Sequence, residues 1–139
     1  MLCSAAKIGT VEGWLERANR ARESGTASLV TVSAERWYAP GFLGRVPAVA
    51  APGLTALLDV DDVSYALCCE ALAGFDARGR DIRVPLLAVA GGLDAAVPLH
   101  AVRELGGRFE VIDGVAHLPS LEAPEAVVAL MLDHLETAR

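Results

Sequence analysis

Two residues of opposite acid–base character each follow a predicted strand in the second half of the chain. Asp94 comes shortly after the segment 85–90, and His117 comes shortly after the segment 108–112. If these segments are neighbouring parallel strands, about 4.8 Å apart, their carboxyl ends place both side chains at one edge of the sheet. A carboxylate there can fix the imidazole tautomer and stabilise the imidazolium formed when a nucleophile loses its proton. The spacing therefore predicts a catalytic acid–base pair.

Each residue also has an ordinary structural interpretation. Asp94 could stabilise a turn or a helix start, and His117 could be a loop histidine. Their placement after successive strands favours the paired interpretation. His100 and His134 fall inside predicted helices, where we expect structural roles.

The cysteines are not arranged for metal binding or for disulfides. There are three, Cys3, Cys68 and Cys69, and the adjacent pair fits neither a metal-site spacing nor a disulfide framework. We expect buried thiols and no metal site.

The elements that position the predicted pair alternate between strand and helix. The run 85–90 is apolar and bounded by proline and glycine, which is typical of a strand covered on both faces. A helix over 98–105 and a strand over 108–112 complete a βαβ unit, whose crossover should be right-handed. A last helix begins between residues 120 and 124. The pattern predicts an α/β fold class.

The first half of the chain has mostly helical patterning. Thr10 can cap a helix whose apolar residues recur every three or four positions. In the second helix, Pro47 and the Pro52-Gly53 pair predict a late start or a break. The segment 27–33 contains strand-forming residues, but the neighbouring periodicity favours a helix. The three main predicted helices cover 11–23, 46–58 and a stretch from Asp61 or Asp62 to Gly74.

Composition excludes several classes of protein. The chain has 139 residues, of which 53% are hydrophobic and 22% charged, so we expect one compact domain. Its 12 Lys and Arg residues against 18 Asp and Glu residues give a net charge of −6, which disfavours nucleic-acid binding. Every apolar run is interrupted before the roughly 18 residues that a membrane helix needs. The first residues lack a secretory-signal pattern, so we expect a cytoplasmic protein without a membrane partner.

Two segments around the predicted pair resemble the carboxyl-terminal end of α/β-hydrolases. They are VPLLAVAG at 84–91, followed by Asp94 and Pro98, and GVAHLPSLEAPE at 114–125. Segments further upstream resemble one subfamily, the 3-oxoadipate enol-lactonases, which open a lactone in the β-ketoadipate pathway of aromatic catabolism. These segments are LCSAAKIGT at 2–10 with Trp14, ERW at 35–37, and the stretch from Tyr65 to Asp76.

The resemblance implies a partial α/β-hydrolase fold. Residues 1–9 would be the remnant of a sheet strand and its loop, 10–76 a helical cap, and 77–139 the last βαβ-α part of the core. Asp94 and His117 would be catalytic residues for the hydrolysis of a lactone or carboxylic ester, without a cofactor.

The nucleophile of such an enzyme is absent from the sequence. α/β-Hydrolases carry it in a Gly-x-Ser-x-Gly turn, and none of the six serines has these flanking glycines. The Ser4-x-x-Lys7 pattern matches a β-lactamase motif, but its partner motifs are missing. We therefore interpret the chain as truncated and inactive by itself, and we expect either a homo-oligomer or association with a complementary amino-terminal half.

The resemblance also implies a small-molecule substrate with a carboxylate, which needs a cation in its pocket. Arg36 is the first candidate, because its guanidinium can bind a carboxylate while Trp37 forms an apolar wall. Lys7 and Arg17 are further candidate cations. Trp14 and Tyr65 could line the same pocket or fill the core.

Two other functions stay open. The chain could be a non-catalytic module, derived from an α/β-hydrolase, that binds a small acid or a partner. A nucleotide-binding domain that uses Gly91-Gly92 as a phosphate loop is a weaker alternative, because the full glycine motif and a phosphate-binding lysine are missing.

Overall fold

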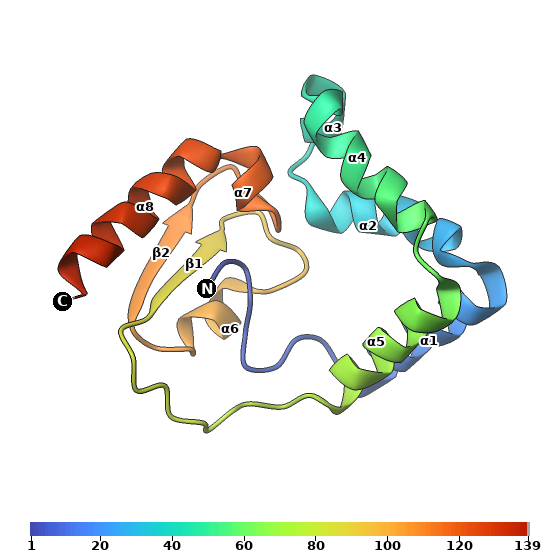
Figure 1. The fold of residues 1–139 in the computed structure, drawn as a ribbon, viewed down its shortest axis with the longest axis horizontal. Coiled ribbons are helices and arrows are strands. Elements are labelled where there is room, and N and C mark those ends of the chain that lie inside the picture. The colour runs from blue at the N-terminus through green and yellow to red at the C-terminus, as the bar shows by residue number, and fades with distance from the viewer. Residues whose placement is uncertain (139) are drawn as a thin grey trace.

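The structure is a computed structural model that describes residues 1–138. The second half of the chain is built around a small parallel sheet. Strands β1 (Leu87–Gly91) and β2 (Arg108–Ile112) pair in parallel and are connected through helix α6 (Leu99–Arg103). On the other edge of β1, Leu2 forms a parallel bridge with Val89 (Figure 1). β1 therefore has a neighbour on each edge, and all five of its residues are buried, as expected of a strand covered on both faces.

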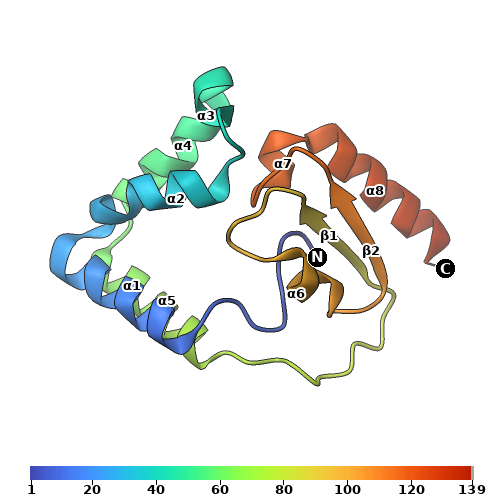
Figure 2. The same cartoon turned by 180° about the vertical axis from the view of Figure 1, so that it is seen from behind.

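Alternate side chains of β1 point to opposite faces of the sheet, and they are apolar on both. Helices therefore pack on both faces. Ala88 and Ala90 form an apolar cluster with Val97 and Val102 from the α6 side. The other face is covered in part by helix α8 (Pro124–Thr137), which follows the short helix α7 (Pro119–Glu122) (Figures 1 and 2). We call residues 1–9 and 75–138 the sheet lobe.

Residues 10–74 form a second, helical lobe. Helices α1 and α5 lie side by side in it, joined by a core of small and aliphatic side chains that includes Ala18, Ala21 and Ala66. Thr10 begins α1 by accepting a hydrogen bond from the Gly13 amide at 3.1 Å, as its N-cap position predicts. The elements are α1 (Val11–Ser24), η1 (Thr26–Leu29), α2 (Val30–Trp37), α3 (Phe42–Arg45), α4 (Pro47–Leu58) and α5 (Asp62–Gly74).

Most element predictions are confirmed, with two differences. Helix α4 continues through Pro52 without a break. Its buried residues Ala50, Leu54 and Leu57 keep one face in the core, which offsets the cost of about 3 kcal/mol for an internal proline. The last predicted helix is divided at Ala123 into α7 and α8. The ambiguous segment 27–33 is helical, within η1 and α2.

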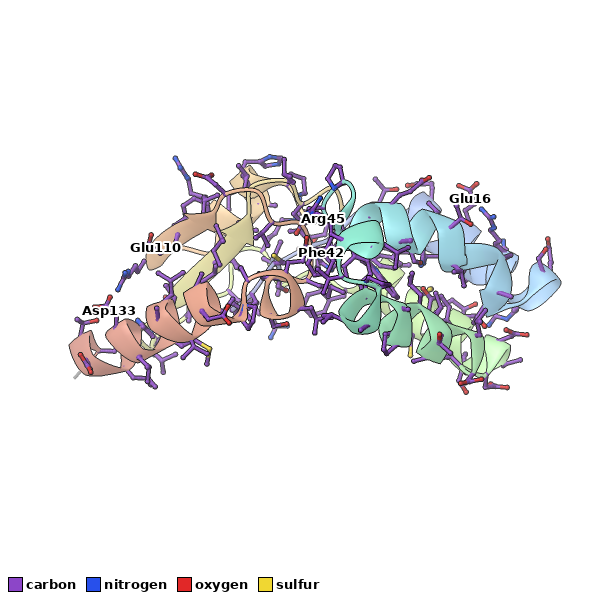
Figure 3. The ribbon with its side chains drawn as sticks, turned by 90° about the horizontal axis from the view of Figure 1, so that it is seen from above. Glu16, Phe42, Arg45, Glu110 and Asp133 are labelled. Atoms are coloured by element: carbon purple, nitrogen blue, oxygen red, sulfur yellow. The ribbon has the colours of Figure 1, made fainter. Side chains whose placement is uncertain are left out.

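The two lobes lie side by side and meet near the end of α2 (Figure 3). Phe42, which is labelled where the lobes meet, belongs to a cluster with Tyr38 against which Leu118 of the sheet lobe packs. The main-chain carbonyl of Trp37 also accepts hydrogen bonds from the amides of His117 and Leu118, at 3.1 and 3.2 Å. Within residues 1–138, none of the helices is long and apolar enough to cross a membrane.

Candidate active site

Asp94 and His117 meet at the carboxyl ends of the two strands, as their positions in the sequence predict. The distance between His117 Nδ1 and Asp94 Oδ2 is 3.0 Å. An ionised carboxylate only accepts hydrogen bonds, so the imidazole donates from Nδ1. This tautomer leaves Nε2 without a proton, and Nε2 is then available to take one from a substrate or a nucleophile.

The loop after β1 holds the Asp94 carboxylate firmly. Its Oδ1 atom accepts hydrogen bonds from the amides of Ala96 at 2.7 Å and Val97 at 3.0 Å, and the side chain has no exposed surface. Burial acts to raise the pKa of Asp94, but the hydrogen bonds from His117 and the two amides outweigh it and lower the pKa. The residue is therefore an anion that can orient and stabilise a protonated imidazole.

The loop that carries His117 is fixed from two sides. The Trp37 carbonyl binds its main chain, and the Glu122 carboxylate accepts hydrogen bonds from the amides of Ala116 and Ala39, both at 2.9 Å. Glu122 thus connects the histidine loop to the end of α2. Glu122 belongs to the segment 114–125 that resembles α/β-hydrolases, but its role could not be predicted, because only the fold brings its two amide partners together.

Gly91 allows the two loops to approach each other. A Cβ atom at this position would lie 2.0 Å from the Ala116 carbonyl oxygen, which is far inside van der Waals contact. Only glycine therefore fits at the end of β1 without displacing the residue next to His117.

A cavity of about 290 Å³ lies between the helical lobe and His117. Its lining is mostly apolar, and Ile8, Ala96 and His117 form its wall on the side of the sheet lobe. The sequence-predicted residues Trp14, Arg36, Trp37 and Tyr65 line it from the helical side, together with Arg17. The fold therefore brings these five residues and His117 to one cavity.

The cavity contains two arginines that have no carboxylate partner within residues 1–138. Arg17 is half-buried, and it donates to the hydroxyl groups of Tyr65 at 2.7 Å and Ser33 at 2.8 Å. Arg36 is exposed at the same cavity. Lys7, the remaining candidate cation, is absent from the cavity lining and lies 3.7 Å from Asp76.

Cys3 lies beside Asp94 and His117, a position that the sequence pattern did not predict. Its Sγ atom, a carboxylate oxygen of Asp94 and a ring nitrogen of His117 all lie within 4.8 Å of one another. Burial, above all, raises the pKa of Cys3 to about 12, so the thiol stays protonated at neutral pH. Cys69 is buried as expected, whereas Cys68 is exposed and lines the cavity.

No family model matches the sequence. Two curated proteins of Acinetobacter baylyi do match it: 3-oxoadipate enol-lactonase 2, with 33% identity over 135 residues, and 3-oxoadipate enol-lactonase 1, with 33% identity over 134 residues. The alignments cover 88% and 91% of this chain but 48% and 50% of those proteins. The chain thus spans about half the length of the curated relatives that it matches.

Solved structures show the same relationship. The enol-lactonase from Burkholderia xenovorans LB400 matches with a TM-score of 0.92 and 30% identity, over 97% of this chain and 54% of that chain. A thermophilic esterase from Thermogutta terrifontis shares the fold, with a TM-score of 0.86 and 20% identity over 99% of this chain and 54% of that chain. These matches confirm the partial α/β-hydrolase fold and the resemblance to the carboxyl-terminal half of 3-oxoadipate enol-lactonase.

Proposed function

We propose that this chain, which has the fold of the carboxyl-terminal half of an α/β-hydrolase, supplies the acid–base pair and substrate pocket of a lactone or carboxylic-ester hydrolase. The observation that carries the proposal is the 3.0 Å contact between His117 and the buried Asp94 carboxylate at the wall of a cavity. The similarity to 3-oxoadipate enol-lactonases favours a lactone that bears a carboxylate as the substrate.

His117 acts as general base and then as general acid in this proposal. Its Nε2 atom takes the proton of a hydroxyl nucleophile while the hydroxyl oxygen bonds to the substrate carbonyl carbon. The ring C–O bond then breaks, and the proton passes from His117 to the departing oxygen. A water molecule then loses a proton to His117 as its oxygen bonds to the acyl carbon. The bond between that carbon and the nucleophile oxygen breaks, and His117 returns the proton to this oxygen, while Asp94 stabilises the imidazolium in each half of the reaction.

The nucleophile comes from a polypeptide segment outside these 139 residues. A nucleophile turn of the Gly-x-Ser-x-Gly type does not occur in the sequence. Among residues 1–138, the His117 side chain hydrogen-bonds to Asp94 and to no serine hydroxyl. Loss of the nucleophile costs about 10⁶ in turnover in a serine hydrolase. The isolated chain is therefore expected to hydrolyse esters at a negligible rate.

The arginines of the cavity bind the substrate carboxylate in this proposal. Arg36 is the first candidate, because its guanidinium has no acidic partner within the described chain and Trp37 lies beside it in the cavity wall. Arg17 adds a second positive charge whose direction is fixed by Ser33 and Tyr65. A dianion, such as the ring-opened product of a carboxylate-bearing lactone, also fits this charge.

Complementation of activity tests the proposal. The full chain is co-expressed with the amino-terminal segment of the Burkholderia xenovorans enol-lactonase, the part that this chain does not match. Hydrolysis of 3-oxoadipate enol-lactone and of an aryl ester is then measured, with the carboxyl-terminal half of that enzyme as the positive control. We expect hydrolysis from the assembled pair. An assembled but inactive pair, next to an active control, would contradict the proposal.

A second candidate function is non-catalytic binding of a small acid. The cavity favours this function, because the chain itself supplies its two arginines and its aromatic walls. The chain does not contain a nucleophile turn of the Gly-x-Ser-x-Gly type. Titration calorimetry of the chain with 3-oxoadipate would show saturable binding that Arg36→Ala weakens and His117→Ala leaves unchanged. Hydrolysis by the assembled pair would exclude this function as the main one.

A further inference from the structure

Three side chains that can bind a transition-metal ion lie together at the carboxyl ends of the strands. They are Cys3, Asp94 and His117, which offer a thiol sulfur, a carboxylate oxygen and a ring nitrogen, all within 4.8 Å of one another. Residues 1–138 contain no other group of three cysteine, histidine or acidic side chains arranged in this way. The cysteine spacing predicts no metal site, because spacing cannot reveal a group whose members come from three separate segments.

The three ligand types suit zinc. In proteins, Zn²⁺ binds cysteine sulfur, histidine nitrogen and carboxylate oxygen at about 2.0–2.3 Å, with tetrahedral geometry. The ligand atoms around such an ion are therefore about 3–4 Å apart. His117 Nδ1 and Asp94 Oδ2, at 3.0 Å, already have this spacing. The Cys3 sulfur is within 4.8 Å of both ligand atoms, so a small movement of its side chain completes the group.

The charges of the group also match a dication. Asp94 is an anion whose side chain has no exposed surface. Burial raises the pKa of Cys3 to about 12, but a thiol that coordinates a metal ion loses its proton outright and becomes a second anion. Two anionic ligands and a neutral imidazole then balance the two positive charges of Zn²⁺. The occupied site is neutral, which avoids the cost of burying an uncompensated charge.

Hydrogen bonds fix two of the ligands before an ion binds. Asp94 Oδ1 accepts from the amides of Ala96 at 2.7 Å and Val97 at 3.0 Å, which leaves Oδ2 free of main-chain bonds. The Cys3 amide donates to the Val89 carbonyl at 2.8 Å, and Cys3 has a φ of 42°, in the left-handed region that non-glycine residues rarely adopt. Bonds that orient metal ligands in this way strengthen metal binding.

His117 gives an ion access to the group. Its side chain is 24% exposed and forms part of the cavity wall, whereas neither Asp94 nor Cys3 lines the cavity. An ion that enters the cavity therefore meets the imidazole first. The buried carboxylate and thiol complete its coordination after it has lost most of its water.

We propose that Cys3, Asp94 and His117 form an inhibitory zinc-binding site. The ion binds Cys3 Sγ, Asp94 Oδ2 and His117 Nδ1, and one water molecule completes the tetrahedron. The S–H bond of Cys3 breaks, and its proton is released to solvent. The imidazole proton moves from Nδ1 to Nε2 by exchange with water, so the ring stays neutral. No group is oxidised or reduced.

The bound ion removes the general base. Nε2 carries a proton in this state and has no lone pair with which to take one from a nucleophile. This effect on hydrolysis rests on the function proposed above, whereas ion binding itself does not depend on that function. The site selects a divalent cation that accepts sulfur and nitrogen ligands, and Mg²⁺, which prefers oxygen ligands, should not bind.

Metal titrations of the full chain, purified without a metal-binding tag, test the site. Calorimetry with zinc chloride should show one ion per chain, and magnesium chloride should show no binding. Cadmium chloride should produce the ultraviolet charge-transfer absorption of a metal–thiolate bond, which oxygen and nitrogen ligands do not give. Cys3→Ser should abolish this absorption and weaken zinc binding at least about tenfold.

The other two cysteines provide the matched control. Cys68→Ser combined with Cys69→Ala leaves Cys3 as the sole thiol, and the cadmium absorption should then be retained. Circular dichroism shows whether each variant is folded, and the combined variant keeps the test decisive if Cys3→Ser fails to fold. Loss of the absorption from the folded combined variant would overturn the proposal, as would its survival in Cys3→Ser.

Imidazole ¹⁵N NMR of the unmodified chain tests the proton shift without any substitution. The His117 proton should be on Nδ1 in the free chain and on Nε2 in the zinc-saturated chain. An unchanged tautomer at saturation would overturn the proposed coordination.

Hydrolysis by the assembled pair tests the inhibitory role. Zinc chloride should abolish hydrolysis, and Cys3→Ser should raise the zinc concentration needed for inhibition at least about tenfold. Hydrolysis that continues in a zinc-saturated pair would overturn the inhibitory role. An assembled pair that is inactive without zinc contradicts the proposed function, and the titrations of the chain alone still decide the zinc site.

Discussion

Substitution of Asp94 by asparagine tests the Asp94–His117 pair in the 139-residue chain itself. The carboxylate accepts hydrogen bonds from His117 Nδ1 at 3.0 Å and from the amides of Ala96 and Val97. An asparagine oxygen can keep the two amide bonds, but its NH₂ group then faces the imidazole as a donor. His117 must therefore move its proton to Nε2, and the nitrogen needed as a base is lost.

The magnitude follows from the contact that is lost. A hydrogen bond to a charged group contributes about 1.5–3 kcal/mol, so Asp94→Asn should lower the free energy of unfolding by about that amount at pH 7. Because the folded-state pKa of Asp94 is lowered, its carboxylate stabilises the fold above the unfolded pKa of about 3.9. That contribution is lost as the pH falls through the folded pKa, so the difference between variant and wild type should shrink in acid.

Urea denaturation at pH 7 and pH 3 measures the stability difference, and ¹⁵N NMR of the imidazole measures the tautomer. Asp113→Asn is the control, because Asp113 is exposed in the histidine loop and has no bond to His117. An unchanged tautomer together with the same loss of stability at both pH values would refute the reasoning.

Three further predictions concern the loops and the cavity. Gly91→Ala should lower the free energy of unfolding by about 1–3 kcal/mol, because the added methyl group would overlap the Ala116 carbonyl oxygen. Gly114→Ala is the control for backbone strain alone, because Gly114 has a positive φ but has open space around it. Thermal denaturation compares the two variants. Glu122→Gln should lower the free energy of unfolding by about 1–3 kcal/mol through weakened bonds to two main-chain amides, and the amide signals of Ala39 and Ala116 should shift in NMR spectra; unmoved signals would contradict the role of Glu122. Arg36→Ala should weaken binding of 3-oxoadipate about tenfold or more, through loss of a charge-assisted pair, in calorimetric titrations; equal affinity would remove Arg36 from the site.

Local patterns in the sequence were sufficient to predict most elements and the central pair. The Thr10 cap and the spacing of apolar residues are properties of single helices, so they are visible without the fold. Asp94 and His117 were predictable because both follow strands, and parallel topology brings strand ends together. The continuity of α4 through Pro52 was not predictable from local patterns. It depends on the burial of Leu54 and Leu57 against other helices, which offsets the local effect of the proline.

The remaining features of the site depend on contacts between distant segments. Arg17 is oriented by Ser33 and Tyr65, which lie on two other helices and are 16 and 48 residues away along the chain. Glu122 joins two amides from different lobes, and Lys7 lies against Asp76 instead of lining the cavity. No spacing rule within one element reveals such contacts.

The most direct test is the turnover of the assembled pair with and without the imidazole. The full chain, complexed with the amino-terminal segment of the Burkholderia xenovorans enol-lactonase, should hydrolyse 3-oxoadipate enol-lactone, and His117→Ala should lower kcat by about 10⁴ to 10⁶. His134→Ala, on the last helix, should retain the wild-type rate. Turnover that survives His117→Ala would show that the Asp94–His117 pair is not the catalytic acid–base pair.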